Sequence, residues 1–141
     1  ALVDTSLWIE YYHPQGNERV RSAVTQVILD DRVLTTPIVV AEVAQGARTP
    51  RELQLLLSDF RAYHMVRLDE DVAELAARLL FALARTGQRV PVTDALVAAA
   101  AIAADAELWH LSDEHYDRLA TVAPEALGGR SLTTRAFSRQ L

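Results

Sequence analysis

Residues 2–12 have the sequence LVDTSLWIEYY, and this stretch is the strongest indication of the fold class. Its first two residues predict the end of a buried strand, and residues 6–12 predict a short helix. The proline and glycine at positions 14 and 16 end that helix. Asp4 stands where the strand ends, and it is the only charged side chain between positions 1 and 9. The chain therefore begins as a strand–helix unit with an acidic residue at its junction.

Short apolar runs alternate with helical patterns along the rest of the chain. Thr36-Pro37 and Thr49-Pro50 each place an N-cap residue before a proline at the first helical position, where its missing N–H is tolerated. Further strands are predicted at residues 33–35, 64–68 and 107–111, and further helices begin near Asn17, Thr36, Thr49, Asp69, Asp94 and Ser112. This alternation predicts the α/β class: a three-layer α/β/α sandwich with a short, mainly parallel sheet. Ligands of such folds bind beyond the carboxyl ends of the strands.

We expect a single domain over residues 1–141, because a chain of 141 residues can bury a core without disulfides. The recognisable motifs lie within residues 2–119. Ser112 is expected to cap a short helix that ends near Leu119. Residues 120–141 are weakly patterned and are expected to hold one last strand and a tail.

The composition excludes several classes of protein. The chain has no cysteine, so disulfides and zinc sites built on thiolates are excluded. Its apolar runs are shorter than the ~20 residues of a membrane helix, and we expect no basic leader sequence. We therefore expect a cytoplasmic protein without membrane contact. The formal net charge of −5 argues against a general nucleic-acid coat and suits a partner that carries arginine.

Four acidic residues are the candidates for chemistry: Asp4, Glu42, Asp94 and Asp113. The first three are each the only charge in an otherwise apolar segment, where burying an unpaired carboxylate costs several kcal/mol. The predicted fold brings all four to the same end of the sheet. Grouped carboxylates repel one another, and a hard divalent cation with oxygen ligands removes this repulsion. The sequence therefore predicts a site for Mg²⁺ or Mn²⁺.

Each acid also has a purely structural interpretation. Asp4 could cap the helix that follows it, and Asp94 could be a helix-start anion. Glu42 could face solvent or pair with an arginine. Asp117 is the alternative to Asp113 as the fourth acid, because both belong to a charged stretch at the start of a predicted helix.

Several neighbours of the acids could support a site. Thr5, Ser6 and Thr93 could hydrogen-bond the carboxylates or a phosphate, although each could equally be a helix cap. The four histidines show no HExxH spacing, and we expect them at surface or strand positions. Trp8 and the two tyrosines that follow it on the first helix predict either core packing or a stacking groove.

Four segments resemble, in order, the motifs of PIN domains, and of VapC-like toxins in particular. They are VDTSLWI at residues 3–9, EVAQG at 42–46, VTDALVAAA at 92–100 and LWHLSDEHY at 108–116. In the fourth segment an acid follows the last strand, and an aromatic residue lies three positions after that acid. Each motif is short, but the four occur in order, and the region that they span, within residues 2–119, is most of the chain.

The resemblance implies an α/β/α fold and Mg²⁺- or Mn²⁺-dependent endonucleolytic cleavage of RNA. Asp4, Glu42, Asp94 and Asp113 would be the catalytic residues that hold the metal. A metal-activated water would then leave a 5′-phosphate and a 3′-hydroxyl. The resemblance also implies the role of toxin in a toxin–antitoxin pair. Its partners would be a cognate antitoxin, the RNA substrate and a second copy in a homodimer, with a larger antitoxin complex left open.

Single residues argue against several other functions. A haloacid-dehalogenase phosphotransferase needs a second aspartate where this chain has Ser6, and a receiver domain needs a lysine, of which there is none. The five glycines form neither a GxGxxG nor a Walker motif. A PIN-type nuclease of RNA maturation and a non-catalytic, RNA-binding PIN-like module remain the alternatives.

Overall fold

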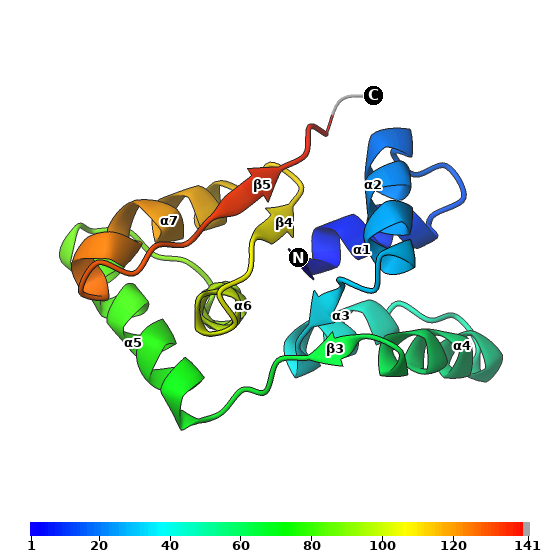
Figure 1. Cartoon of the computed structure of the whole chain (residues 1–141), viewed down its shortest axis with the longest axis horizontal. Helices are drawn as coiled ribbons and strands as arrows, with labels where there is room; N and C mark the ends of the chain where they lie inside the picture. The colour runs from blue at the N-terminus through cyan, green and yellow to red at the C-terminus, as the bar shows by residue number, and fades with distance from the viewer. Residues whose placement is uncertain (140–141) are drawn as a thin grey trace.

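The computed structural model describes residues 1–139, in which short strands alternate with helices (Figure 1). The strands are β1 (Leu2–Val3), β2 (Leu34–Thr35), β3 (His64–Met65), β4 (Leu108–His110) and β5 (Thr134–Ala136). The helices are α1 (Thr5–Tyr12), α2 (Glu18–Leu29), α3 (Pro37–Ala44), α4 (Pro50–Arg61), α5 (Glu70–Arg85), α6 (Val92–Ala103) and α7 (Glu114–Ala126). The predicted α/β class is confirmed.

The strands form one sheet in the order β3-β2-β1-β4-β5, and every pair is parallel. Leu2 of β1 is in register with Leu34 of β2 on one side and with Leu108 of β4 on the other. The strand order reverses between β1 and β4, so these two strands flank the topological switch point. Ligands of open α/β sheets bind there, beyond the carboxyl ends of the strands.

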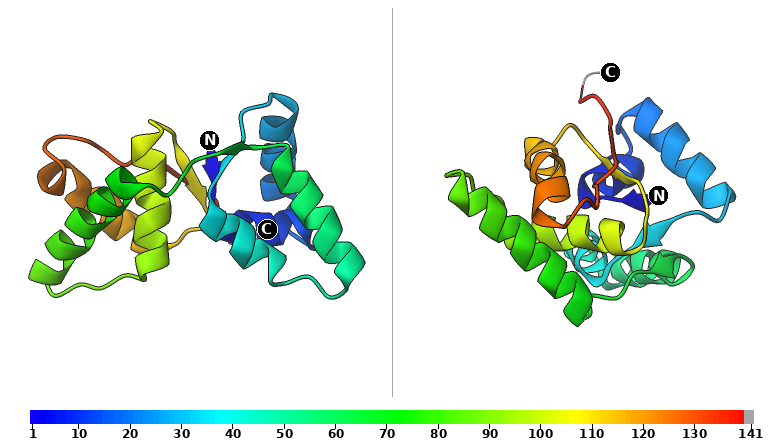
Figure 2. Two further views of the ribbon diagram at one scale, coloured as in Figure 1. Left: turned by 90° about the horizontal axis from the view of Figure 1, so that it is seen from below. Right: turned by 60° about the vertical axis from the view of Figure 1, so that its left-hand side comes forward.

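Two groups of helices flank the sheet. Helices α1 to α4 lie on one side and α5 to α7 on the other, with the strands between them (Figure 2). This arrangement confirms the expected three-layer sandwich. No helix within residues 1–139 is long and apolar enough to cross a membrane.

Helix α6 is buried along most of its length. Its residues 95 and 97–102 all belong to the hydrophobic core, and most of them are alanines. Small side chains let the backbones of neighbouring helices approach closely, and α6 packs against both α5 and α7. Because α6 is fixed in the core, the first turn of the helix, which carries Asp94, is fixed as well.

The predicted helix starts are mostly confirmed by their hydrogen bonds. The Asn17 side chain accepts hydrogen bonds from two backbone N–H groups at the start of α2. The side chains of Thr36 and Thr49 each accept one such hydrogen bond, at the starts of α3 and α4. Trp8 is fully buried, and its Nε1 donates to the carbonyl of Val3 at 3.2 Å. It packs against Phe60 of α4, so the core interpretation of Trp8 is the right one.

The expected cap of α7 was wrong by one residue. Asp113 is the N-cap, since its Oδ1 accepts the backbone N–H of His115 at 2.9 Å. Ser112 instead has a φ of 46°, and its hydroxyl donates to the carbonyl of Phe137 at 2.6 Å. The Ser112 hydroxyl, which the local pattern predicted to cap the helix, instead bonds to the carbonyl of a residue 25 positions later in the sequence.

Helix α7 is also longer than expected, because it continues to Ala126 instead of ending near Leu119. Buried Ala123 extends the apolar face of Tyr116 and Leu119 by another turn, despite the proline that follows it. The expected last strand is confirmed as β5. The end of the expected tail, residues 140–141, lies outside the described residues.

Candidate metal centre

Asp4 is buried in the turn between β1 and α1. As the N-cap of α1, its Oδ2 accepts from the backbone N–H of Ser6 at 3.2 Å and from the Ser6 hydroxyl at 2.7 Å. Its Oδ1 accepts from the hydroxyl of Tyr116 at 2.7 Å. The Ser6 Oγ also accepts the N–H of Leu111 at 3.2 Å, which ties the first turn of α1 to the residue that follows β4. Asp4 is therefore both a helix cap and a fixed carboxylate at the switch point.

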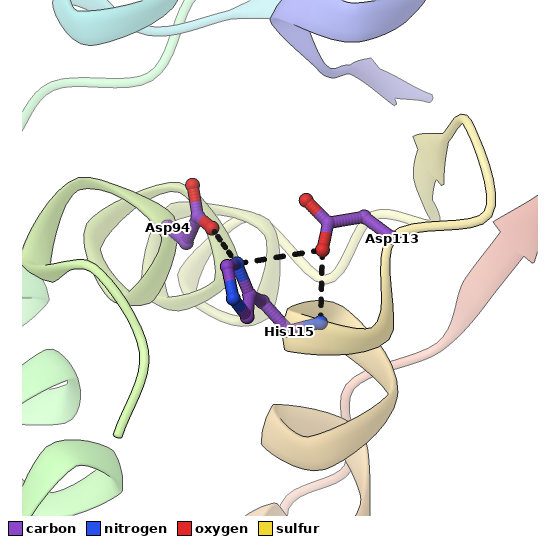
Figure 3. Close-up of side chains that lie close together, drawn as sticks. All are labelled: Asp94, Asp113 and His115. Carbon is purple, nitrogen blue, oxygen red and sulfur yellow. Dashed lines mark hydrogen bonds and ion pairs between the residues drawn. The ribbon is translucent and has the colours of Figure 1, made fainter.

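Asp94, Asp113 and His115 converge from α6 and from the start of α7 (Figure 3). Nδ1 of His115 lies 2.9 Å from Oδ2 of Asp94 and 3.4 Å from Oδ1 of Asp113. One donor atom of each residue lies within 4.8 Å of the other two. Such spacing allows the three side chains to bind one metal ion together.

The pKa of Asp94 is raised by burial and by the negative charges of Asp113 and Asp4. Burial raises the pKa of the Asp94 carboxyl, and the hydrogen bond with His115 opposes this. The negative charges of Asp113 and Asp4 raise that pKa further, and the net result lies above the ordinary value. Three carboxylates thus share one electrostatic site, although they come from the β1–α1 turn, from α6 and from the β4–α7 turn. A bound divalent cation would relieve this repulsion.

Glu42 lies at the edge of this region. The Thr5 hydroxyl on α1 donates to Oε1 of Glu42 on α3 at 2.8 Å, and Glu42 is half-buried. Within residues 1–139, the tight cluster around His115 includes neither Asp4 nor Glu42. Thr5 therefore connects Glu42 to the turn that holds Asp4, while the structure gives no direct contact between Glu42 and another acid.

Two buried rings position the carboxylates. The Tyr116 hydroxyl remains a proton donor to Asp4, because burial and the neighbouring carboxylates raise the pKa of Tyr116 far above its usual range. His110 Nδ1 accepts the backbone N–H of Asp113 at 2.9 Å. Burial lowers the pKa of His110, which favours the neutral ring that such acceptance requires. Each ring thus holds one of the acids in place.

Two of the sequence candidates are exposed and make no hydrogen bond with the acids within residues 1–139. Thr93 is exposed on α6, and its hydroxyl makes no hydrogen bond within residues 1–139. Asp117, the substitute for Asp113, is exposed on α7 and is not a member of the tight cluster. The geometry therefore favours Asp113 as the fourth acid.

His115 is the residue that the sequence interpretation missed, because a surface or strand position was expected for it. It lies in the first turn of α7, two residues after Asp113. This position could have identified His115 from the sequence, because a histidine in the first turn after an acidic N-cap lies at the same end of the sheet as the cap. A search for helical pairs such as HExxH cannot find a histidine whose partner, here Asp94, comes from another helix.

The model of the PIN domain family matches residues 1–122. The chain belongs to the PIN domain family. PIN domains are generally nucleases, which supports an enzyme, and PIN nucleases typically use divalent metal ions. A comparison with curated proteins finds no match.

Solved structures with the same fold include FitAcB and VapBC proteins, and VapBC-5 is described as a member of a family of toxin–antitoxin systems. FitAcB from Neisseria gonorrhoeae is 23% identical with a TM-score of 0.68, and the alignment covers 94% of each chain. VapBC2 from Rickettsia felis, bound to a promoter DNA fragment, is 16% identical with a TM-score of 0.74 over 96% of this chain and 97% of that one. VapBC-5 from Mycobacterium tuberculosis is 22% identical with a TM-score of 0.64 over 97% and 98%. At these identities the likeness shows the PIN fold.

Proposed function

We propose that this chain is a metal-dependent endoribonuclease that acts as the toxin of a toxin–antitoxin pair. The observation that carries the proposal is that Asp4, Asp94 and Asp113 lie near one another beyond the carboxyl ends of β1 and β4. Asp94 and Asp113 both lie close to Nδ1 of His115, and the Tyr116 hydroxyl links Asp4 to the start of α7. The three residues are distant in sequence, and they meet at the place where open α/β sheets bind their ligands.

The donor set fits Mg²⁺ or Mn²⁺. Carboxylate oxygens are the ligands that both ions accept. Burial, together with the negative charges of Asp113 and Asp4, raises the pKa of Asp94 above its ordinary value, and a bound cation would favour its ionised form. Asp4, Asp94 and Asp113 would hold the metal, with Glu42 at the edge of the site. The bound metal would lower the pKa of a water molecule and stabilise negative charge on the phosphate.

The protein's own groups would orient the carboxylates and move a proton. Ser6 and Tyr116 fix Asp4 at both of its oxygens, so its orientation needs no rearrangement when substrate arrives. Thr5 fixes Glu42 in the same way at one oxygen. A carboxylate that is not engaged by the metal can accept the proton of the attacking water. A serine or cysteine nucleophile is then unnecessary.

RNA as the substrate is supported by the resemblance of the four sequence motifs to VapC-like toxins. The toxin role has further support from the solved structures of similar fold, one of which is a VapBC toxin–antitoxin system of Mycobacterium tuberculosis. The net charge of −5 and the acidic centre suit an antitoxin segment that places an arginine or lysine near the acids. A homodimer, alone or within a complex with the antitoxin, is the assembly that we expect.

The proposed function can be tested by incubating the protein with a pool of structured RNAs and Mn²⁺ or Mg²⁺. Asp94→Asn is the test variant, and Asp105→Asn is the matched control, because Asp105 follows the opposite end of α6. We expect the wild type and the control to cut, EDTA to stop cleavage, and Asp94→Asn to lose about 100-fold or more of the rate. Equal cleavage by wild type and Asp94→Asn would refute the site. RNA binding without cleavage by any form would favour the non-catalytic module.

A further inference from the structure

We propose that His115 is a nitrogen ligand of the metal and that it makes the centre prefer Mn²⁺ to Mg²⁺. This inference rests on the proposed function, since it concerns the same centre. The observation behind it is the position of the imidazole ring, which lies between the carboxylates of Asp94 and Asp113 (Figure 3).

The spacing of the three side chains is that of neighbouring ligands around one ion. In an octahedral site with ligands at about 2.1 Å, adjacent donor atoms lie about 3 Å apart. His115 Nδ1 is 2.9 Å from Oδ2 of Asp94 and 3.4 Å from Oδ1 of Asp113. All three residues can therefore contribute a donor atom to one ion with little movement.

The backbone holds the His115 ring on the side of the acids. Oδ1 of Asp113 accepts the backbone N–H of His115 at 2.9 Å and also lies close to its Nδ1. The ring is about two-thirds buried, with a side-chain exposure of 33%. In the tautomer that carries its proton on Nε2, the Nδ1 atom offers a lone pair to a metal.

An imidazole nitrogen changes the choice of ion. Mg²⁺ binds oxygen ligands almost exclusively, whereas imidazole favours transition-metal ions. Mn²⁺ accepts carboxylates as readily as Mg²⁺ does and also tolerates a nitrogen ligand. A centre of two or three carboxylates and one imidazole should therefore bind Mn²⁺ more tightly than Mg²⁺.

The competing interpretation is that His115 serves only as a counter-charge for Asp94 and Asp113 in the absence of metal. In that case the ring has to leave when the ion binds, and its removal would strengthen the binding of both ions. Ligation predicts the opposite: removal of His115 weakens Mn²⁺ binding. The two interpretations therefore predict opposite changes in Mn²⁺ affinity when His115 is removed.

The first test is calorimetric titration of Mn²⁺ and Mg²⁺ into wild type, His115→Ala and His115→Asp. His64→Ala is the matched control, because His64 is exposed on β3 and lies near Asp31 rather than near the site. We expect His115→Ala to lose about tenfold or more in Mn²⁺ affinity and less than about threefold in Mg²⁺ affinity. His115→Asp, which supplies an oxygen instead, should shift the preference toward Mg²⁺. Equal losses for both ions, or tighter binding, would overturn the inference.

The second test is pulsed electron paramagnetic resonance of bound Mn²⁺, which detects a directly coordinated nitrogen. We expect a nitrogen coupling in the wild type and in His64→Ala that changes when the histidines are labelled with ¹⁵N, and its loss in His115→Ala. Because the labelled wild type is measured directly, this test does not depend on the folding of a variant.

The outcomes separate this inference from the proposed function. Mn²⁺ binding that requires Asp94, without any nitrogen coupling, would overturn only the role of His115. A wild-type protein that binds neither ion would overturn both.

Discussion

Asp4 and Asp94 differ in how their charges are compensated, and this difference predicts different responses to mutation. The Asp4 carboxylate accepts hydrogen bonds from Ser6 and Tyr116 at both oxygens. The Asp94 carboxylate has one partner within the described residues, His115, and it is exposed to the negative charges of Asp113 and Asp4. Asp4 is thus stabilised by its surroundings, whereas Asp94 is held in place at a cost in stability.

Asp94→Asn is expected to stabilise the metal-free protein. The neutral amide removes the cost of burying this charge and its repulsion by Asp113 and Asp4, which should raise the melting temperature by roughly 3 °C, equivalent to about 1 kcal/mol. Because the pKa of Asp94 is raised, the folded wild type binds this proton more tightly than the unfolded chain does. The stability of the wild type therefore falls as the pH rises through the pKa that Asp94 has in the folded protein. The variant, which has no carboxyl group at this position, should not show this decrease.

Thermal unfolding in EDTA at about pH 4 and about pH 7.5 tests this prediction, because the pKa of Asp94 lies above its ordinary value of 3.8 and the gain should be larger at the higher pH. Added Mn²⁺ should then raise the melting temperature of the wild type and leave that of the variant unchanged. A variant that melts below the wild type at both pH values would show that Asp94 is stabilising.

Tyr116→Phe is expected to destabilise the protein by about 1–3 kcal/mol, because Oδ1 of buried Asp4 loses its donor. Tyr11→Phe is the control: the Tyr11 hydroxyl makes no hydrogen bond within residues 1–139, and its loss should cost less than about 0.5 kcal/mol. Denaturant unfolding measures both values. Equal losses would mean that the Tyr116 hydroxyl does not support Asp4.

At this scale the sequence predicts the acids but not their partners. Asp4 and Asp94 could be recognised because each is a lone charge in an apolar segment, and such a charge needs compensation wherever the chain places it. His115 and the Tyr116 hydroxyl could not be assigned, because their roles depend on contacts with residues 21 and 112 positions away.

Among the elements, α6 places the strictest limits on substitution. Ala98→Leu is expected to destabilise the protein by about 1–3 kcal/mol, because Ala98 is fully buried and its neighbours have no room for a larger side chain. Ala103→Leu lies on the exposed side of the same helix, and its effect should stay within about 0.5 kcal/mol. Chemical denaturation of the two variants makes the comparison, and a similar stability for both would argue against close packing of α6.

The elements could be predicted where local chemistry determines them. Asn17, Thr36 and Thr49 cap their helices as expected, since the side chain and the N–H groups that it satisfies are at most three residues apart. The start of α7 was misplaced because Ser112 bonds to Phe137, which is 25 residues away. Nothing in the local sequence signals this competition.

For the whole molecule, the C-terminal strand completes the sheet and supports the site. Residues 134–136 pair with β4, and the Phe137 carbonyl accepts the hydroxyl of Ser112 beside Asp113. Asn17 Nδ2 also donates to the carbonyl of Ser138 at 3.1 Å, which joins the segment after β5 to the N-cap of α2. This segment lies beyond residues 1–122, to which the family model extends.

Phe137→Ala is expected to destabilise the protein by about 3 kcal/mol, because the buried ring packs against Trp109. Phe81→Ala removes an equally large ring that is 63% exposed on α5 and should cost less than about 1 kcal/mol. Differential scanning calorimetry compares the two. If Phe81→Ala is the more damaging variant, the C-terminal segment does not stabilise the fold as described.

The alternation of strands and helices predicts the α/β class and the end of the sheet where the acids gather. It does not predict that β4 pairs with β1, because strand order depends on which faces the helices cover. That pairing brings Tyr116 to Asp4, and so it completes the site.

The most direct test of the central claim is the chemistry of the RNA ends that the protein produces with Mn²⁺. Hydrolysis by a metal-activated water leaves 5′-phosphate and 3′-hydroxyl ends. We expect these ends from the wild type, and we expect none of these fragments from Asp94→Asn or Asp113→Asn. Fragments with 5′-hydroxyl and 2′,3′-cyclic phosphate ends, or fragments that both variants still produce, would contradict a carboxylate-bound metal as the catalyst.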